Sequence, residues 1–182
     1  TRLYQTDPGY ENYRKLKERL KSRLYDKILQ IDFNNQLHNE AQKVYYTCHK
    51  QISIVQILLA KSARYSTIRL AEKLLKKAER YHLTNLSLEL STILRGHYAN
   101  NHGDIKKFEY YNEAVNRLNV WRSAELKAEE YYYNISIHFA VSKAARPDLE
   151  PMAINFVAEL YQRYPEIHTR QYKLFLYQLE VS

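Results

Sequence analysis

The sequence predicts an all-α fold built from antiparallel helical hairpins. The 182 residues include only three glycines and four prolines, whereas sheets need many turns rich in these residues. Apolar residues recur at intervals of three and four, which is the spacing of one helix face. Apolar residues make up 45% of the chain and charged residues 26%, as in folded globular proteins. We therefore expect one helical-repeat domain over residues 1–182, as part of a longer chain.

The first third of the chain predicts three helical segments. Pro8 suits the first position of a helix, and the pattern that follows it continues to about residue 31. An apolar stripe opposite a basic face runs along this helix and consists of Leu16, Leu20, Leu24 and Ile28. After a polar break at 32–36, a second helix is expected to run to about His49. The apolar segment 52–63 predicts a further helix or half-helix.

The rest of the chain predicts helices over about 68–81, 86–98, 105–118, 123–144, 147–164 and after Pro165, so that the total is about eight or nine. Ser66 or Thr67 is a candidate N-cap for the first of these helices, and Thr84 for the second. Gly103, near the end of "NNHGD", suits a left-handed C-cap.

The segment "ILRGHYANNHGDIKKFEYYNEAV" (93–115) resembles a tetratricopeptide repeat, a pair of helices in about 34 residues. Gly96 stands where that family has a glycine in its first helix, Gly103 and Asp104 match its turn, and Tyr111 matches an aromatic of its second helix. "LYDKILQIDFNN" resembles the end of another repeat. The resemblance implies a right-handed superhelix, or α-solenoid, with a concave groove. Carried over by position, the residues that face this groove are Leu90, Ile93, His97, Asn100 and Asn101.

The resemblance implies a protein–protein interaction scaffold that binds a peptide or a partner helix in this groove. The sequence has neither a phosphate-binding Gly-Lys-Ser/Thr loop nor a Gly-x-Ser-x-Gly nucleophile motif. His97 and His102 are five residues apart, which is a poor spacing for two metal ligands on one helix face. We therefore expect no enzyme, no cofactor and no metal site.

The net charge of +8 offers an alternative function. Residues 14–27 hold seven basic and two acidic residues, a net +5, which leaves +3 for the rest of the chain. This first helix could bind phosphates of a nucleic acid or touch an anionic membrane surface, or it could simply be a solvated outer face. The candidate phosphate contacts are Arg14, Lys15, Lys17, Arg19, Lys21 and Arg23.

Tyrosine is abundant, with 18 residues, and it clusters at 45–46, 110–111 and 131–133. Adjacent helical residues point about 100° apart, so a cluster cannot form one flat platform for nucleic-acid bases. Glu129 and Glu130 would also repel phosphates. We expect the rings to pack against different neighbouring helices, while the hydroxyls reach water or a carbonyl.

Cys48 is the only cysteine, so an intrachain disulfide is excluded, and we expect a small buried residue in a cytoplasmic protein. The longest apolar run, 52–60, is too short to span a bilayer. The last helix is rich in large apolar residues, so we expect either the preceding helices or a second copy, in a homodimer, to cover it. These residues are Tyr172, Leu174, Phe175, Leu176 and Tyr177.

Overall fold

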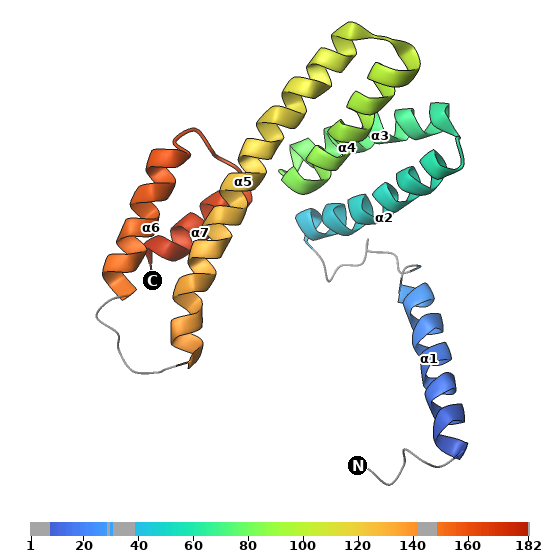
Figure 1. Ribbon diagram of the computed structural model, residues 1–182, viewed down its shortest axis with the longest axis horizontal. Helices are drawn as coiled ribbons and strands as arrows, with labels where there is room; N and C mark the ends of the chain where they lie inside the picture. The colour runs from blue at the N-terminus through green and yellow to red at the C-terminus, as the bar shows by residue number, and fades with distance from the viewer. Residues whose placement is uncertain (1–7, 29, 31–38, 142–148, 182) are drawn as a thin grey trace. The chain divides into compact units, whose positions relative to one another are not determined.

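The computed structural model describes residues 8–28, 30, 39–141 and 149–181. Within these ranges the chain forms seven α-helices, one π-helical turn and no β-strand (Figure 1). The all-α prediction is therefore confirmed. None of the described helices combines the length and the apolar content that a membrane crossing requires. The chain divides into two compact units, residues 1–50 and 51–182, and each is described by itself.

The first unit contains α1 (Pro8–Ile28), which begins at the proline that the sequence predicts as its start. The apolar stripe of α1 is exposed rather than buried. Its residues Leu16, Leu20 and Leu24 retain 66%, 67% and 55% of their accessible surface. The polar break predicted at 32–36 lies outside the described residues.

The start of α2 (Glu40–Ala60) is fixed by a reciprocal pair of hydrogen bonds. The Asn39 side chain accepts from the Gln42 amide at 2.8 Å, and the Gln42 side chain accepts from the Asn39 amide at 3.2 Å. This is a capping box in which Asn takes the usual place of Ser or Thr. Cys48, further along α2, is fully buried, as expected.

The turns on either side of α3 (Arg64–Arg80) have the same backbone conformation. Ser62 precedes α3 and His82 precedes α4 (Thr84–His97), and both are left-handed, with φ of 57° and 53°. In each turn the amide of the next residue donates to the carbonyl five positions earlier. This hydrogen bond is the Schellman pattern of a helix C-terminus. The same turn type therefore closes two successive hairpins.

This turn also explains why the predicted N-caps are wrong. The N-caps of α3 and α4 are Ala63 and Leu83, and neither makes a side-chain capping bond. The Schellman turn enters the next helix within one residue, so Ser66, Thr67 and Thr84 already lie inside the helices. The Thr67 hydroxyl instead donates to the carbonyl four residues earlier.

The fifth helix, α5 (Ile105–Val141), is continuous over 37 residues. Gly103 closes the π-helical turn η1 (Tyr98–His102) before it, and its φ of 58° confirms the predicted left-handed cap. The sequence instead predicts two helices, at 105–118 and 123–144, and it likewise divides α2 near residue 50. Both divisions are wrong, so the described residues hold seven helices and not eight or nine. Without a glycine or proline inside either segment, helix propagation continues through it.

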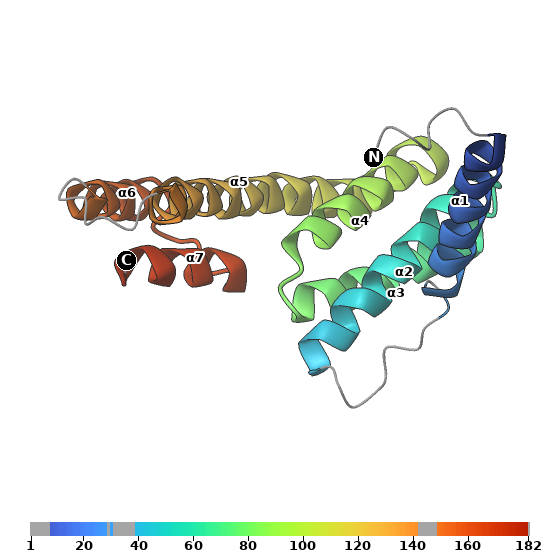
Figure 2. The ribbon, with the colours of Figure 1, turned by 90° about the horizontal axis from the view of Figure 1, so that it is seen from below.

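The second unit is arranged along α5. α4 lies beside its first half, and α6 (Leu149–Arg163) and α7 (Arg170–Glu180) lie beside its second half (Figures 1 and 2). Ala124 and Ala128 of α5 are fully buried against this second group, where their small side chains allow close approach. In α7, Tyr172 and Leu176 are buried and Phe175 packs on the core, but Leu174 and Tyr177 are exposed. The other helices of this unit therefore cover one face of α7, as predicted, whereas the face with Leu174 and Tyr177 is exposed.

The tyrosine clusters of α5 divide between core and surface, as the 100° spacing predicts. Tyr111 and Tyr131 are 7% and 5% exposed, whereas Tyr110 and Tyr133 are 59% and 55% exposed. The Tyr131 ring stacks on Phe156 of α6 with centroids 4.0 Å apart. Tyr132 is half-buried and its ring contacts Phe175 of α7, with centroids 5.6 Å apart. Packing is thus confirmed for Tyr111, Tyr131 and Tyr132. In the cluster at 45–46 both rings are exposed.

A hydroxyl-to-carboxylate hydrogen bond joins α3 to η1, α4 to α5, α5 to α6 and α6 to α7. Three of the four donors are tyrosines, of which Tyr98 and Tyr131 are buried and Tyr161 is exposed. The bonds are Tyr98 to Glu72 (2.7 Å), Thr84 to Glu125 (2.6 Å), Tyr131 to Glu159 (2.5 Å) and Tyr161 to Glu180 (2.8 Å).

We expect substitution by alanine to have opposite effects at Gly96 and Gly103, the two glycines whose surroundings the structure describes. A Cβ at Gly96 would meet no described heavy atom within 4 Å, so Gly96→Ala should raise the free energy of unfolding by about 0.5–1 kcal/mol through helix propensity. Gly103→Ala should lower it by about 1–2 kcal/mol, because alanine resists positive φ. Urea denaturation followed by circular dichroism measures both. A destabilised Gly96→Ala variant would show that this glycine is needed for close helix packing.

Alkaline pH should weaken the packing of α7 through Tyr172. Burial is the main cause that raises the pKa of its hydroxyl from 10.0 to about 12, and the hydroxyl donates to the Leu160 carbonyl at 3.1 Å. The neutral hydroxyl therefore stabilises the fold fully below pH 10, and this contribution is lost as the pH rises through about 12.

The comparison of wild type with Tyr172→Phe at a series of pH values tests this expectation. Near neutral pH, Tyr172→Phe should be less stable by about 1 kcal/mol, the value of one hydrogen bond. Above pH 10 the difference should shrink and then reverse, because phenylalanine does not ionise. Tyr177→Phe removes an exposed hydroxyl from the same helix and is the control. The same pH dependence in both variants would contradict the role of Tyr172.

Candidate functional site

Two cavities lie at opposite ends of the α3–α4 hairpin. The first, which we call the groove cavity, has a volume of about 510 Å³ and opens between the first half of α3 and the end of α4. The second, the turn cavity, has a volume of about 210 Å³ and lies where the α3–α4 turn meets the middle of α5. The groove cavity is lined by Arg64, Tyr65, Ile68, Arg69, Glu72, His97 and Tyr98.

One wall of the groove cavity is held rigid by a polar network. The Tyr98 hydroxyl donates to Glu72 at 2.7 Å and accepts from the Lys107 ammonium at 2.8 Å. Its ring stacks on Tyr111, with the ring planes 5° apart. Burial is the main cause that raises the pKa of Tyr98, so its hydroxyl remains a hydrogen-bond donor at neutral pH. The Lys107 ammonium also lies 3.6 Å from the Glu72 carboxylate and neutralises its charge.

The opposite wall of the groove cavity offers an aromatic ring and a cation to solvent. Tyr65 is 75% exposed, and the Arg69 guanidinium lies 5.6 Å from its ring centroid and donates to its hydroxyl at 3.4 Å. An aromatic residue and an arginine four positions apart share one helix face. This spacing is a signal in the sequence from which the site could have been found. The cavity combines aromatic, apolar and basic groups, so it suits a peptide side chain that is acidic or aromatic.

The residues that the resemblance assigns to the groove are dispersed in the structure. His97 is half-buried and lines the groove cavity, whereas Ile93 is half-buried without lining it. Leu90 is fully buried and offers no surface to a partner, and Asn100 is exposed. The side chain of Asn101 lies outside the described residues. Tyr65, Arg69 and Tyr98 line the cavity in place of most of the expected set.

The cations of α1 do not form a single line. Arg14, Lys15, Lys17, Arg19 and Arg23 are exposed and Lys21 is half-buried. At 100° per residue they point over more than half of the helix circumference. Lys15 and Lys21 also pair within the helix, each at 3.0 Å, with Glu11 and Glu18. Binding of phosphates by this helix stays a prediction.

A buried carboxylate connects α4 to α5 beside the turn cavity. Glu125 is 1% exposed, accepts from the Thr84 hydroxyl at 2.6 Å and lies 3.5 Å from the Arg122 guanidinium. A buried charge costs several kcal/mol unless it is paired and hydrogen-bonded. The hydrogen bond from Thr84 and the ion pair with Arg122 together offset this cost. Glu125 thereby fixes the start of α4 against the middle of α5.

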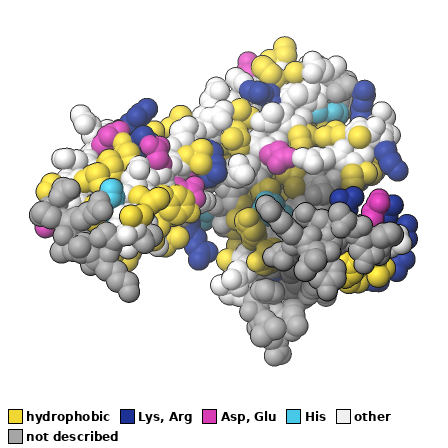
Figure 3. Space-filling view, turned by 60° about the horizontal axis from the view of Figure 1, so that its bottom comes forward, with side chains coloured by type: hydrophobic (Ala, Val, Ile, Leu, Met, Phe, Trp, Pro, Cys, Tyr) yellow, Lys and Arg dark blue, Asp and Glu magenta, His cyan; other side chains and the backbone are white. Residues whose placement is uncertain are grey.

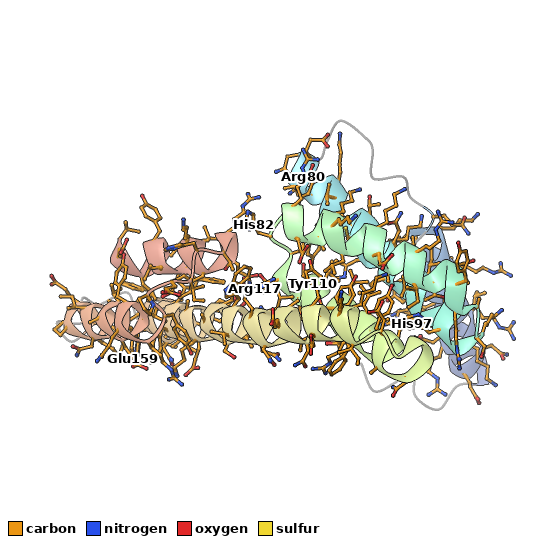
Figure 4. All side chains as sticks on the ribbon, turned by 90° about the horizontal axis from the view of Figure 1, so that it is seen from above. Arg80, His82, His97, Tyr110, Arg117 and Glu159 are labelled. Atoms are coloured by element: carbon orange, nitrogen blue, oxygen red, sulfur yellow. The ribbon has the colours of Figure 1, made fainter. Side chains whose placement is uncertain are left out.

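The turn cavity brings together residues from four elements. Glu79 and His82 come from the end of α3 and its turn, Ser87 from α4, Arg117 from α5 and Thr169 from the cap of α7. In Figure 4, His82 and Arg117 lie near each other in the space between the α3–α4 hairpin and α7. Sequence spacing gives no sign of this site, because its residues are as many as 90 positions apart (79 to 169).

The α5–α7 end of the second unit carries apolar side chains at its surface. Figure 3 shows hydrophobic side chains there among acidic and basic ones. A cleft of about 600 Å³ lies between α6 and α7 and is lined mainly by apolar residues, including Ala153, Ile154 and Val157. A homodimer through α7 stays a prediction.

Comparison with protein-family models, with curated proteins and with solved structures finds no match to this chain. Among the described residues, no three His, Cys, Asp or Glu side chains are grouped as a metal site would require.

Removal of the Thr84 hydroxyl should destabilise the second unit. Thr84→Val keeps the size of the side chain but leaves the buried Glu125 carboxylate without its shortest hydrogen bond, so we expect a loss of about 2–3 kcal/mol in the free energy of unfolding. Thr92→Val is the matched control, because the exposed Thr92 hydroxyl bonds only the Leu88 carbonyl of its own helix. Urea unfolding measures both, and equal losses would contradict a special role for the Thr84–Glu125 bond.

Proposed function

We propose that this chain is a non-enzymatic protein-interaction scaffold with tetratricopeptide-like helical hairpins, and that it binds a peptide segment in the groove cavity. The observation that carries the proposal is the composition of this cavity. Its volume of about 510 Å³ falls within the roughly 300–1,000 Å³ of sites that bind compact ligands. One wall is fixed by the Tyr98 network, and the other presents the exposed Tyr65 and Arg69.

The repeated turn supports the hairpin part of the proposal. Ser62 and His82 adopt the same left-handed conformation, and each is followed by one residue and the next helix. A stack of hairpins needs such a repeated connection, because each helix must pack on both the previous and the following helix. α4 does so, since it contacts both α3 and α5. The right-handed superhelix belongs to this proposal as well.

The charges of the groove cavity favour a peptide with an acidic side chain near an aromatic or aliphatic one. Arg64, Arg69 and His97 supply positive or titratable groups, whereas Glu72, the one acidic residue of the lining, is already neutralised by Lys107. Tyr65 offers a large ring at low entropic cost, as interface tyrosines do. The aliphatic side chain of Ile68 supplies an apolar floor.

Selection from a random peptide library on the immobilised full chain, followed by titration of the selected peptides, tests this function. Tyr65→Ala should weaken binding by about tenfold or more, which corresponds to about 1.4 kcal/mol. Because Tyr65 is 75% exposed, this substitution should leave the fold intact. Tyr133→Ala, which removes an exposed tyrosine of α5, is the matched control. Failure to enrich any peptide, or equal weakening by both variants, would contradict the proposal.

A further inference from the structure

We propose that the turn cavity binds a free α-amino acid, whose carboxylate pairs with Arg117 and whose ammonium group pairs with Glu79. This small-molecule site is separate from the groove cavity and does not depend on the scaffold function.

The buried hydroxyl is that of Ser87. This residue is 1% exposed, and its Oγ has no hydrogen-bond partner in the described chain. Buried hydroxyls are almost always hydrogen-bonded, and Ser87 lines the turn cavity. Thr169, 3% exposed, lines the same cavity. Its Oγ1 accepts from the Tyr172 amide, so its own proton is available to a ligand.

Two opposite charges face the cavity without forming an ion pair. Glu79 reaches it from α3 and Arg117 from α5, and neither side chain has a hydrogen bond or ion pair with any residue that the structure describes. A guanidinium binds a carboxylate through two parallel hydrogen bonds, and a carboxylate accepts from an ammonium group. A simple anion would be repelled by Glu79 and a simple cation by Arg117. A zwitterion satisfies both groups.

Trp121 positions the cation and closes one side of the cavity. The Arg117 guanidinium lies 5.6 Å from the centroid of the Trp121 ring, a cation–π distance that favours this placement of the arginine. Trp121 and Leu118 line the same cavity and offer an apolar surface to the side chain of the amino acid. The site therefore has one group for each part of the ligand.

The size of the cavity limits the ligand. Its volume of about 210 Å³ is below the roughly 300–1,000 Å³ of pockets that hold drug-sized molecules. A single amino acid is of the appropriate size class, whereas a longer peptide would have to extend out of the cavity.

The chain offers its own reporter for an experiment, because Trp121 is the only tryptophan. Fluorescence of the full chain, excited where tyrosine does not absorb, is titrated with each standard L-amino acid in turn. We expect a saturable change with at least one of them. Absence of a saturable change with every amino acid, in protein shown to be folded by circular dichroism, would overturn the proposal.

Three variants test the assigned contacts. Arg117→Gln and Glu79→Gln should each raise the dissociation constant by about tenfold or more, which corresponds to about 1.4 kcal/mol. Arg80→Gln is the matched control, since Arg80 is exposed and adjacent in sequence to Glu79 but does not line the cavity. Unchanged binding in the first two variants, or an equal loss in Arg80→Gln, would overturn the assignment.

Two analogues of the bound amino acid test the zwitterion itself. The corresponding carboxylic acid without the amine loses the contact with Glu79, and the corresponding amino acid amide loses the charge that pairs with Arg117. Both should bind about tenfold more weakly or worse. If either analogue binds as well as the amino acid, a zwitterion site is excluded.

Discussion

The second unit depends on one recurring interaction, a hydroxyl of one helix that donates to a glutamate of the next. This bond joins α3 to η1, α4 to α5, α5 to α6 and α6 to α7. Apolar packing alone brings helices together without a strong preference for their relative sliding position, because it is not directional. A short bond to a charged oxygen is directional. It fixes which turn of one helix meets which turn of its neighbour, and so it positions both cavities.

The abundance of tyrosine follows from the same constraint. A serine or threonine hydroxyl reaches a neighbouring helix only where the backbones are close, as at Thr84. A tyrosine can fill an interface with its ring and still carry its hydroxyl to the far side, as Tyr131 does between Phe156 and Glu159. Adjacent tyrosines of α5 then face different surroundings, so Tyr111 and Tyr131 are buried while Tyr110 and Tyr133 are exposed.

The sequence predicts local features that depend on a few neighbouring residues. The all-α fold, the start of α1 at Pro8 and the left-handed Gly103 all follow from such features. Helix number was overestimated because a change in the buried face of α5 looks like an interruption, although no breaker residue is present. The N-caps were misplaced because the Schellman turns at Ser62 and His82 contain no glycine that would reveal them. Of the candidate sites, His97 could be predicted, whereas Ser87, Arg117 and Thr169 meet only through tertiary packing.

The helix-joining bonds also affect how the fold responds to ionic strength. An exposed ion pair weakens as salt is added, because the attraction between two full charges is screened. A neutral hydroxyl that donates to a carboxylate has no opposite full charge, so much less of its energy is lost to screening. A chain with net charge +8 can therefore exchange counterions, or approach a polyanion, while α3 to α7 keep these bonds.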